Sequence, residues 1–310
     1  MNDSSGATNA AAKTAQDDRW TVLRLLKWTT EFFESRGSQS PRLDAEILLA
    51  HSLACSRIEL YTAFESEPDE EQRTCFRELV QRRGEGAPVA QLVGYKEFYS
   101  LRFDVNEHTL IPRPETEHLV IAALDHLKQC DPQDHPPAIA DIGTGSGAIA
   151  VSIAVHSPSS QLTAIDISPQ ALQVAASNAQ LHCAEDRIEF VQSDLLADVD
   201  SERVFDLICS NPPYVSESEY QQLDPSVKGY EPKTALVSGP TGTEIIERIL
   251  QLAENRLVPG GLMLIELSPM IAEQCLRLAN ALDHLVDAKL INDFSGLQRV
   301  LVAHRASPIH

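Results

Sequence analysis

The 310-residue sequence is poor in cysteine, with six scattered residues, and in aromatic residues, which make up 5% of it. No two cysteines form C-x-x-C, and none pairs with histidine at zinc-ligand spacing, so we expect reduced thiols and no metal site. No apolar run approaches the roughly 18 residues that a membrane span needs. The first 18 residues lack the apolar core of a secretory signal. We therefore expect a cytoplasmic protein that neither enters nor crosses a membrane.

Positive charge is also scarce, since 25 Lys and Arg stand against 45 Asp and Glu, which gives a net charge of −20. Residues 1–105 carry 13 basic and 17 acidic side chains, whereas residues 106–310 carry 12 and 28, a net charge of −16. Such a region repels a phosphate backbone unless it has a dedicated basic patch. The only basic cluster is Arg82 with Arg83. We therefore expect no direct binding to nucleic acid.

The N-terminal third of the chain changes character twice. Residues 1–16 are small and polar and predict a disordered tail. Residues 17–86 carry apolar side chains at helical spacing, with helix starts at Ser40-Pro41 and near Pro68, and predict a small helical domain. Residues 87–112 change to the alternation of strands, so we predict a β-hairpin connector there.

The connector is expected to contain short strands at 89–92, 98–105 and 110–111, ended by prolines on both sides of Arg113. From 113 to 310, strand and helix patterns alternate, which predicts an α/β domain with a doubly wound, mostly parallel sheet. The last two strands are joined by a short turn at 294–296. That turn is too short for a crossover helix, so we expect these strands to be antiparallel neighbours.

A glycine-rich loop lies between the first strand of this domain and an alanine-rich helix. A glycine loop in this context indicates a nucleotide-type ligand, because glycine lets the backbone approach it closely and the helix N-terminus offers free N–H groups. Gly143, Gly145 and Ala148 fit the relaxed dinucleotide pattern, but the third glycine at 147 favours S-adenosylmethionine. The candidate cofactor-binding residues of the loop are Asp141, Gly143, Thr144, Gly145, Ser146 and Gly147.

Acidic residues follow the next two strands. Asp166 ends the second strand, where a carboxylate can accept both hydroxyls of a ribose. Asp194 follows the third strand and is placed to accept an adenine amine, with Leu195 as an apolar neighbour of the ring. The alternative for either carboxylate is a solvated residue in a loop.

The most specific motif is Asn-Pro-Pro-Tyr at 211–214, directly after the fourth strand. The carboxyl ends of strands are where open α/β sheets place their chemistry. An amide or exocyclic amine is a poor nucleophile, and the Asn211 side-chain oxygen and the Pro212 carbonyl can accept its two N–H groups. Pro212 and Pro213 stiffen the segment and offer no competing N–H, and Tyr214 can pack on a flat substrate. We predict that these four residues bind the substrate and carry out methylation of a planar nitrogen.

These motifs resemble those of S-adenosylmethionine-dependent methyltransferases of the seven-stranded class, and most of all the release factor glutamine methyltransferase family (HemK/PrmC type). The resemblance covers about 20–305. It is carried by the runs at 40–51, 88–98, 110–117, 141–150, 210–214 and 231–236. Leu195 departs from it, since an aromatic residue is common there.

The resemblance implies a Rossmann-like, seven-stranded class I methyltransferase domain behind a helical N-terminal domain that docks the substrate protein. It implies transfer of a methyl group from S-adenosyl-L-methionine, without a metal, to the side-chain N5 of the glutamine in the GGQ motif of class I peptide chain release factors. S-adenosyl-L-homocysteine is the implied product. Nothing in the sequence demands more than a monomer.

Several alternatives share parts of this pattern. Adenine-N6 methyltransferases of nucleic acid share the Asn-Pro-Pro-Tyr motif, but the negative charge of 106–310 disfavours them. Ribosomal-protein glutamine methyltransferases depart from Arg-Pro-Glu-Thr-Glu at 113–117. A nicotinamide-dependent oxidoreductase, or a binding module without activity, leaves the motif at 211–214 unexplained. Arg113 and Glu115 have two interpretations: they shape the entrance to the site, or they form a salt bridge between domains.

Overall fold

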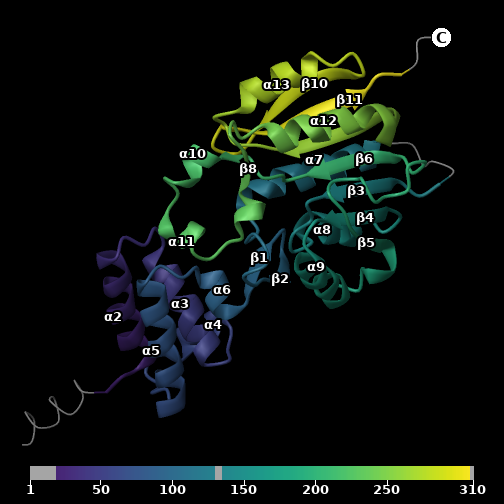
Figure 1. The fold of residues 1–310 in the computed structure, drawn as a ribbon. Helices are drawn as coiled ribbons and strands as arrows, with labels where there is room; N and C mark the ends of the chain where they lie inside the picture. The colour runs from purple at the N-terminus through teal and green to yellow at the C-terminus, as the bar shows by residue number, and fades with distance from the viewer. Residues whose placement is uncertain (1–18, 130–134, 308–310) are drawn as a thin grey trace, which may run out of the picture. The chain divides into compact units, whose positions relative to one another are not determined.

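The computed structural model describes residues 19–129 and 135–307, so the predicted tail over 1–16 lies outside the described residues. The chain divides into two compact units, one ending at Val93 and the other beginning at Gly94. Figure 1 shows helices in the first unit and a sheet flanked by helices in the second. Each unit has its own core.

The first unit is made of helices. They are α2 (Val22–Ser35), α3 (Pro41–Ser52), α4 (Arg57–Thr62), α5 (Glu70–Gly84) and α6 (Val89–Val93). Side chains cap three of the starts: Thr21 accepts from the Arg24 N–H, and capping boxes form at α4 (Ser56 with Glu59) and at α5 (Asp69 with Gln72). The core includes Phe33, which is 1% exposed.

Two expectations for the N-terminal region are wrong. Residues 89–93 form α6 and not a strand, and the Pro88 carbonyl accepts the Gln91 and Leu92 N–H groups at its start. A short apolar run does not distinguish a buried helix from a buried strand. Residues 110–111 form no strand and lie in a loop. The helix α4 was also not anticipated, because it is only six residues long.

A hairpin is present in the predicted connector, but its strands differ from those expected: β1 (Tyr95–Phe98) pairs antiparallel with β2 (Leu101–Asp104), and its turn interrupts the run 98–105 that was expected to be one strand. Tyr99 and Ser100 form its two-residue turn with φ of 49° and 61°, as a turn that follows the strand twist requires. The Asn178 side chain binds the Asp104 backbone through both its N–H and its carbonyl, at 2.8 and 3.0 Å. These bonds hold the hairpin against α9 within the second unit.

The second unit is built on a seven-stranded sheet in the order β10-β11-β9-β6-β3-β4-β5. Its strands are β3 (Ala138–Ile142), β4 (Gln161–Asp166), β5 (Ile188–Gln192), β6 (Phe205–Ser210), β9 (Leu257–Glu266), β10 (Leu285–Asn292) and β11 (Gln298–Arg305). The first five are parallel, while β11 is antiparallel to both β9 and β10. The predicted α/β sheet and its antiparallel closing pair are confirmed.

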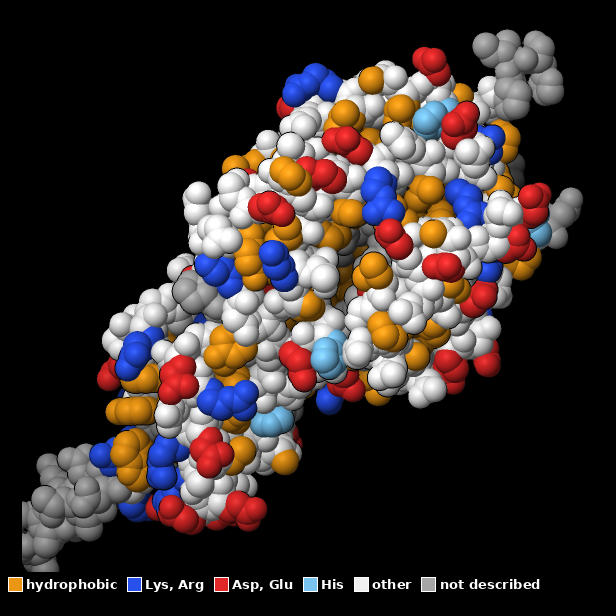
Figure 2. All heavy atoms as spheres, viewed as in Figure 1, with side chains coloured by type: hydrophobic (Ala, Val, Ile, Leu, Met, Phe, Trp, Pro, Cys, Tyr) orange, Lys and Arg blue, Asp and Glu red, His pale blue; other side chains and the backbone are white. Residues whose placement is uncertain are grey.

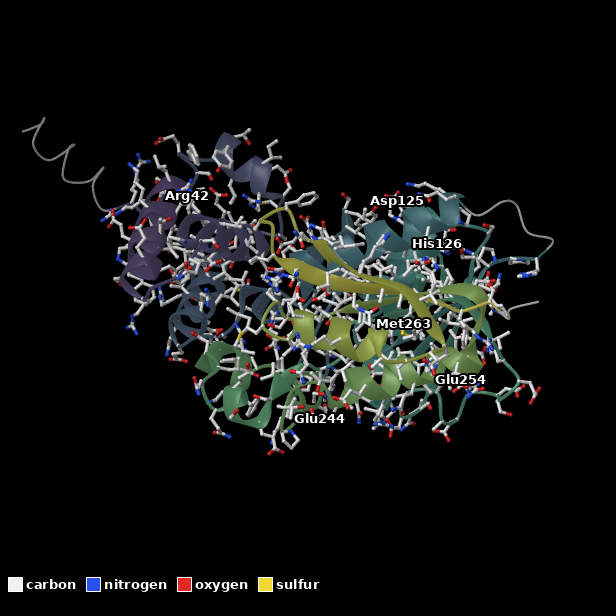
Figure 3. All side chains as sticks on the ribbon, turned by 90° about the horizontal axis from the view of Figure 1, so that it is seen from above. Arg42, Asp125, His126, Glu244, Glu254 and Met263 are labelled. Atoms are coloured by element: carbon white, nitrogen blue, oxygen red, sulfur yellow. The ribbon has the colours of Figure 1, made fainter. Side chains whose placement is uncertain are left out.

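Helices cover both faces of this sheet. They are α7 (Glu117–Gln129), preceded by the turn η1 (Pro114–Thr116), then α8 (Ala148–His156), α9 (Pro169–Leu181), α12 (Glu244–Arg256) and α13 (Ala272–Asn280). Ile139 packs in one apolar cluster with α7 and α8, whereas Ala140 packs in the other with α12 and α13. Figure 3 shows Met263 of β9 inside the layers and Glu254 of α12 at the periphery.

A long connection from β6 to α12 lies beside the carboxyl edge of the sheet. It contains α10 (Glu217–Tyr220), α11 (Pro225–Lys228), the turn η3 (Lys233–Ala235) and a small parallel pair of β7 (Val215–Ser216) and β8 (Val237–Gly239). A further turn, η2 (Glu185–Arg187), precedes β5. Among the described residues, no helix is both long and apolar enough to cross a membrane.

Candidate active site

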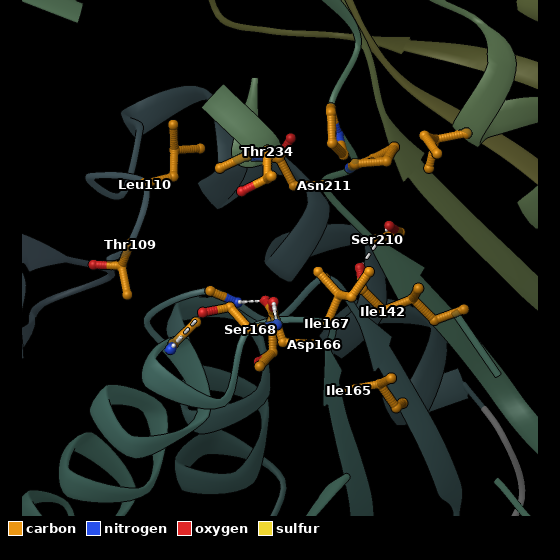
Figure 4. A pocket seen from close by; sticks show the side chains of 18 of the residues that line it. Thr109, Leu110, Ile142, Ile165, Asp166, Ile167, Ser168, Ser210, Asn211 and Thr234 are labelled. Carbon is orange, nitrogen blue, oxygen red and sulfur yellow. Dashed lines mark hydrogen bonds between the residues drawn. The ribbon is translucent and has the colours of Figure 1, made fainter. Parts of the chain in front are cut away.

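A cavity of about 360 Å³ opens in the second unit at the carboxyl ends of β3, β4, β5 and β6. Strand order reverses at β3, which lies between β4 and β6, and ligands of open α/β sheets bind at such switch points. In Figure 4, Asp166 and Ser168 lie on one side of the cavity and Thr234 on the other. The predicted residues that line it are Gly143, Thr144, Gly145, Ser146, Asp166, Asp194, Leu195, Asn211, Pro212 and Pro213.

The glycine loop follows β3 and turns its backbone toward the cavity. Gly143 and Gly145 have φ of +74° and +57°, and a Cβ built on either meets no atom within 4 Å. The backbone there faces open space that a side chain would fill, which suits close approach of a ligand. Gly147 differs, because its Cβ would lie 3.1 Å from the Ala175 Cβ of α9. Gly147 does not line the cavity and permits the close packing of α8 on α9.

Asp141 lies beneath this loop and does not line the cavity. Its Oδ2 accepts the Thr144 hydroxyl at 2.6 Å and the Ala150 N–H at 3.1 Å, so it ties the loop to the start of α8. Its Oδ1 has no partner among the described residues. Complete burial raises the pKa of Asp141 to about 7.

Asp166 joins the end of β4 to the same loop. Its Oδ2 accepts the Gly145 N–H and its Oδ1 accepts the Ser168 N–H, both at 2.9 Å. Burial raises its pKa above the usual range, although these backbone hydrogen bonds oppose the shift. Each carboxylate oxygen has room for a second hydrogen bond, so Asp166 can hold the loop and still accept ligand hydroxyls.

The loop that follows β5 contributes Asp194 and Leu195 to the cavity lining. Asp194 forms an ion pair with Arg248 of α12 at 2.8 Å, and both side chains are about half exposed, at 53% and 48%. Arg248 also lines the cavity and was not predicted from the sequence. Nothing in its local pattern distinguishes it from other basic residues on an amphipathic helix.

The Asn-Pro-Pro-Tyr segment follows β6. Asn211 donates from Nδ2 to the Thr116 hydroxyl oxygen at 3.2 Å. Among the described residues, nothing donates a hydrogen bond to Asn211 Oδ1. Tyr214 does not line the cavity, and burial raises its pKa to about 12, so it is neutral at physiological pH. The cavity therefore presents Asn211, Pro212 and Pro213 opposite the glycine loop.

Comparisons with known proteins identify the family of this chain. The PrmC N-terminal domain matches residues 24–94, and the methyltransferase small domain matches residues 122–224. A release factor glutamine methyltransferase of Rhodopirellula baltica is 55% identical over 95% of this chain and the whole of that protein. One of Chlorobaculum tepidum is 39% identical over 91% of this chain and 96% of that protein. The chain belongs to the release factor glutamine methyltransferase family.

The fold is also found in more distant solved structures. The catalytic domain of hMettl16, solved with the MAT2A 3'UTR hairpin 6, aligns with a TM-score of 0.50 at 16% identity. The alignment covers 75% of this chain and 83% of that one. It supports the seven-stranded methyltransferase fold of this family member.

Arg113 and Glu115, whose role the sequence left open in this methyltransferase, each approach an oppositely charged side chain. Arg113 pairs with Glu231 at 2.5 Å, and Glu231 also accepts the Ile111 N–H at 3.3 Å. Glu115 approaches Arg299 at 4.0 Å. Both pairs lie within the second unit, so the interpretation as a salt bridge between domains is wrong. Arg113 lines the cavity, whereas Glu231 is buried behind it.

Glu266 at the end of β9 is a further acidic residue that the sequence analysis missed. It is 2% exposed. Burial is the main reason why its pKa is raised to about 7. Its position at the end of an apolar strand pattern was the feature of the sequence that could have identified it. Within the described residues, no group of three or more His, Cys, Asp or Glu side chains is arranged to hold a metal ion.

Proposed function

We propose that this enzyme transfers a methyl group from S-adenosyl-L-methionine to the side-chain N5 of the glutamine in the GGQ motif of class I peptide chain release factors. Its close relatives carry release factor glutamine methyltransferase in their names. The Asn-Pro-Pro-Tyr segment supplies acceptors suited to a planar amide beside a cavity suited to the methyl donor. The chain thus combines the family's sequence with a site whose chemistry matches.

The orientation of the Asn211 amide is the observation that carries this proposal. Because Nδ2 donates to Thr116, Oδ1 is the atom left to accept a hydrogen bond from the substrate. A glutamine amide has two N–H groups, and Asn211 Oδ1 and the Pro212 carbonyl would accept one each. Such acceptors favour positive charge at the nitrogen as it is methylated, and they are fixed before the reaction begins.

The opposite wall of the cavity fits the cofactor. The open backbone of Gly143 and Gly145 would take its methionine part, Asp166 its ribose, and Asp194 with Leu195 its adenine. S-adenosylmethionine supplies an electrophilic methyl group and leaves as S-adenosylhomocysteine. Asp141, with Thr144, holds the loop in shape from beneath. Contact between Tyr214 and the substrate, expected from the motif, stays a prediction.

For the other parts of the chain, we propose that the helical domain over 17–86 docks the release factor and that the enzyme acts as a cytoplasmic monomer. The 106–310 region has a net charge of −16, which disfavours direct contact with nucleic acid. On the face shown in Figure 2, acidic and basic side chains are interspersed. This surface suits a protein substrate.

The test is methyl transfer from labelled S-adenosylmethionine to a purified class I release factor, compared with its GGQ Gln→Ala variant. Label in the wild-type factor alone is the expected result. Label in both factors, or in neither although the enzyme binds the cofactor, contradicts the proposed acceptor. Ribosomal proteins and nucleic acid, offered in the same assay, then identify the alternative methyltransferases.

A further inference from the structure

We propose that Arg248 of α12 is a specificity-determining residue for the base of the cofactor, because it fixes the Asp194 side chain as an acceptor for an exocyclic amine. This inference rests on the proposed function, which assigns Asp194 to the adenine of S-adenosylmethionine. Arg248 belongs to none of the motifs that the sequence shares with the family. Both side chains line the cavity.

Arg248 and Asp194 meet through one oxygen of the carboxylate. Arg248 Nη2 donates to Asp194 Oδ2 at 2.8 Å. The two residues are 54 positions apart, so the contact forms only when α12 lies against the loop after β5. No described residue donates a hydrogen bond to Asp194 Oδ1. One carboxylate oxygen is therefore occupied, and the other is left for a ligand.

Other residues hold the backbone of this loop. The Ser193 N–H donates to the Asp166 carbonyl oxygen at 3.0 Å, and the Ser193 hydroxyl accepts the Asp198 N–H at 2.9 Å. Arg256 of α12, which is 7% exposed, donates to backbone carbonyl oxygens further along the loop. These carbonyls belong to Leu196, Val199, Asp200 and Arg203. The backbone at Asp194 is thus held in place without Arg248.

The pair of Arg248 with Asp194 therefore acts on a side chain and not on the fold. The two side chains are 48% and 53% exposed, and ion pairs in contact with water contribute little to stability. An exposed aspartate without a partner turns between staggered rotamers. The guanidinium bound to Oδ2 holds Asp194 in one of them.

A carboxylate held in this way selects one kind of base. An ionised carboxylate only accepts hydrogen bonds, so Asp194 Oδ1 pairs with the 6-amino group of adenine and repels the 6-oxo group of hypoxanthine. A site built around one hydrogen bond rejects the analogue that cannot form it. Without Arg248, Asp194 can turn away from a 6-oxo group, and the discrimination between the two bases weakens.

Two ligands that differ at the purine 6 position test this role. Calorimetric titration of the whole chain compares S-adenosylhomocysteine with S-inosylhomocysteine. In the wild type, we expect the Kd for the inosyl compound to be about tenfold to a hundredfold higher, as for one charge-assisted hydrogen bond. Arg248→Leu should lower this ratio about threefold or more, as for two coupled side chains in contact. Arg248→Lys keeps a positive charge for Oδ2 and should restore part of the ratio.

The matched control is Arg203→Leu. Arg203 forms an ion pair with Glu189 of β5, their side chains are 35% and 57% exposed, and neither residue lines the cavity. This variant loses a comparable ion pair of the same unit, so we expect the wild-type ratio of Kd values. An unchanged ratio in Arg248→Leu, or an equal fall in Arg203→Leu, overturns the inference.

A double variant tests whether Arg248 acts through Asp194. Asp194→Asn places an amide at the site, which can donate to a 6-oxo group as well as accept from a 6-amino group, so the ratio should fall toward one. Adding Arg248→Leu to Asp194→Asn should then change the ratio no further. A further fall of the size seen in Arg248→Leu alone contradicts a role through Asp194.

These titrations contain no release factor, which keeps the inference separate from the proposed function. A wild type that discriminates between the two ligands but does not methylate release factors overturns only the proposed function. A wild type that binds both ligands equally overturns only the inference. A wild type that binds neither ligand overturns the inference together with the proposed cofactor.

Discussion

The two walls of the cavity are held by different kinds of interaction. The glycine wall (residues 141–147 with Asp166) is shaped by its backbone, with glycines at positive φ and a carboxylate that accepts backbone N–H groups. The tetrad wall (residues 110–116, 210–214 and Glu231) is shaped by side chains, namely the ion pair of Arg113 with Glu231 and the hydrogen bond from Asn211 to Thr116. One wall is formed from a local turn, and the other from segments far apart in the sequence.

Under the proposed function, this difference separates cofactor binding from catalysis. The hydrogen bonds that shape the glycine wall join residues of β3, β4, the loop after β3 and the start of α8, which are close together in the sequence. Such a loop is typical of a binding site for a small ligand. The bonds of the tetrad wall join residues 95 and 118 positions apart. Its acceptor groups are therefore placed by the whole folded unit, which gives the preorganisation that a transition state requires.

The largest effect is expected for Asn211→Ala. Loss of the acceptor should reduce kcat roughly 100- to 1,000-fold, or about 2.7–4 kcal/mol, by analogy with loss of one oxyanion-hole donor. Single-turnover methyl transfer measures this, with cofactor binding by calorimetry as the control. If the variant keeps more than a tenth of the wild-type rate, Asn211 has no part in the mechanism.

The second expected effect is on stability. Glu231→Ala leaves Arg113 and the Ile111 N–H without their acceptor, and Glu231 is almost fully buried, with 1% of its side chain exposed. Removing one partner of a buried pair costs about 3–5 kcal/mol, and we expect the lower end because Arg113 remains partly solvated. Urea unfolding measures the loss. Glu231→Gln, which keeps the size of the side chain and an acceptor, should lose clearly less, and equal losses would assign the effect to the lost charge and not to packing or to the bond from Ile111.

The same contrast explains how far the sequence could predict the site. The alternating strands and helices over 113–310, the glycine loop before an alanine-rich helix and the end of the second strand at Asp166 were predicted as the structure has them, because glycines, caps and apolar runs are local signals. The bond from Asn211 to Thr116 joins residues 95 positions apart and depends on the order of the strands, so it could not be predicted. The short apolar run at 89–92 was predicted to be a strand but lies in the helix α6, because tertiary packing decides the structure of such segments.

The glycine wall should respond in cofactor affinity more than in turnover. Asp166→Asn removes the charge that would accept the ribose hydroxyls, and a charge-assisted hydrogen bond is worth roughly 1.5–3 kcal/mol. We expect the Kd for S-adenosylmethionine to rise roughly tenfold to a hundredfold. Calorimetric titration measures it. A Kd within twofold of wild type, with kcat reduced instead, would contradict the assignment of cofactor binding to the glycine wall and of catalysis to the tetrad wall.

The smallest effects separate two glycines of one loop. Gly145→Ala should cost about 1–2 kcal/mol of unfolding free energy from its positive φ, and its methyl group would enter the open space of the cavity, so cofactor affinity should fall. Gly147→Ala has the same backbone strain, but its methyl group meets Ala175 of α9 at 3.1 Å. We expect it to lose more stability than Gly145→Ala and less cofactor affinity. Thermal unfolding with and without cofactor measures both, because a bound ligand raises Tm according to its concentration over Kd. Equal loss of affinity in the two variants would mean that the ligand senses the shape of the whole loop and not the open backbone at Gly145.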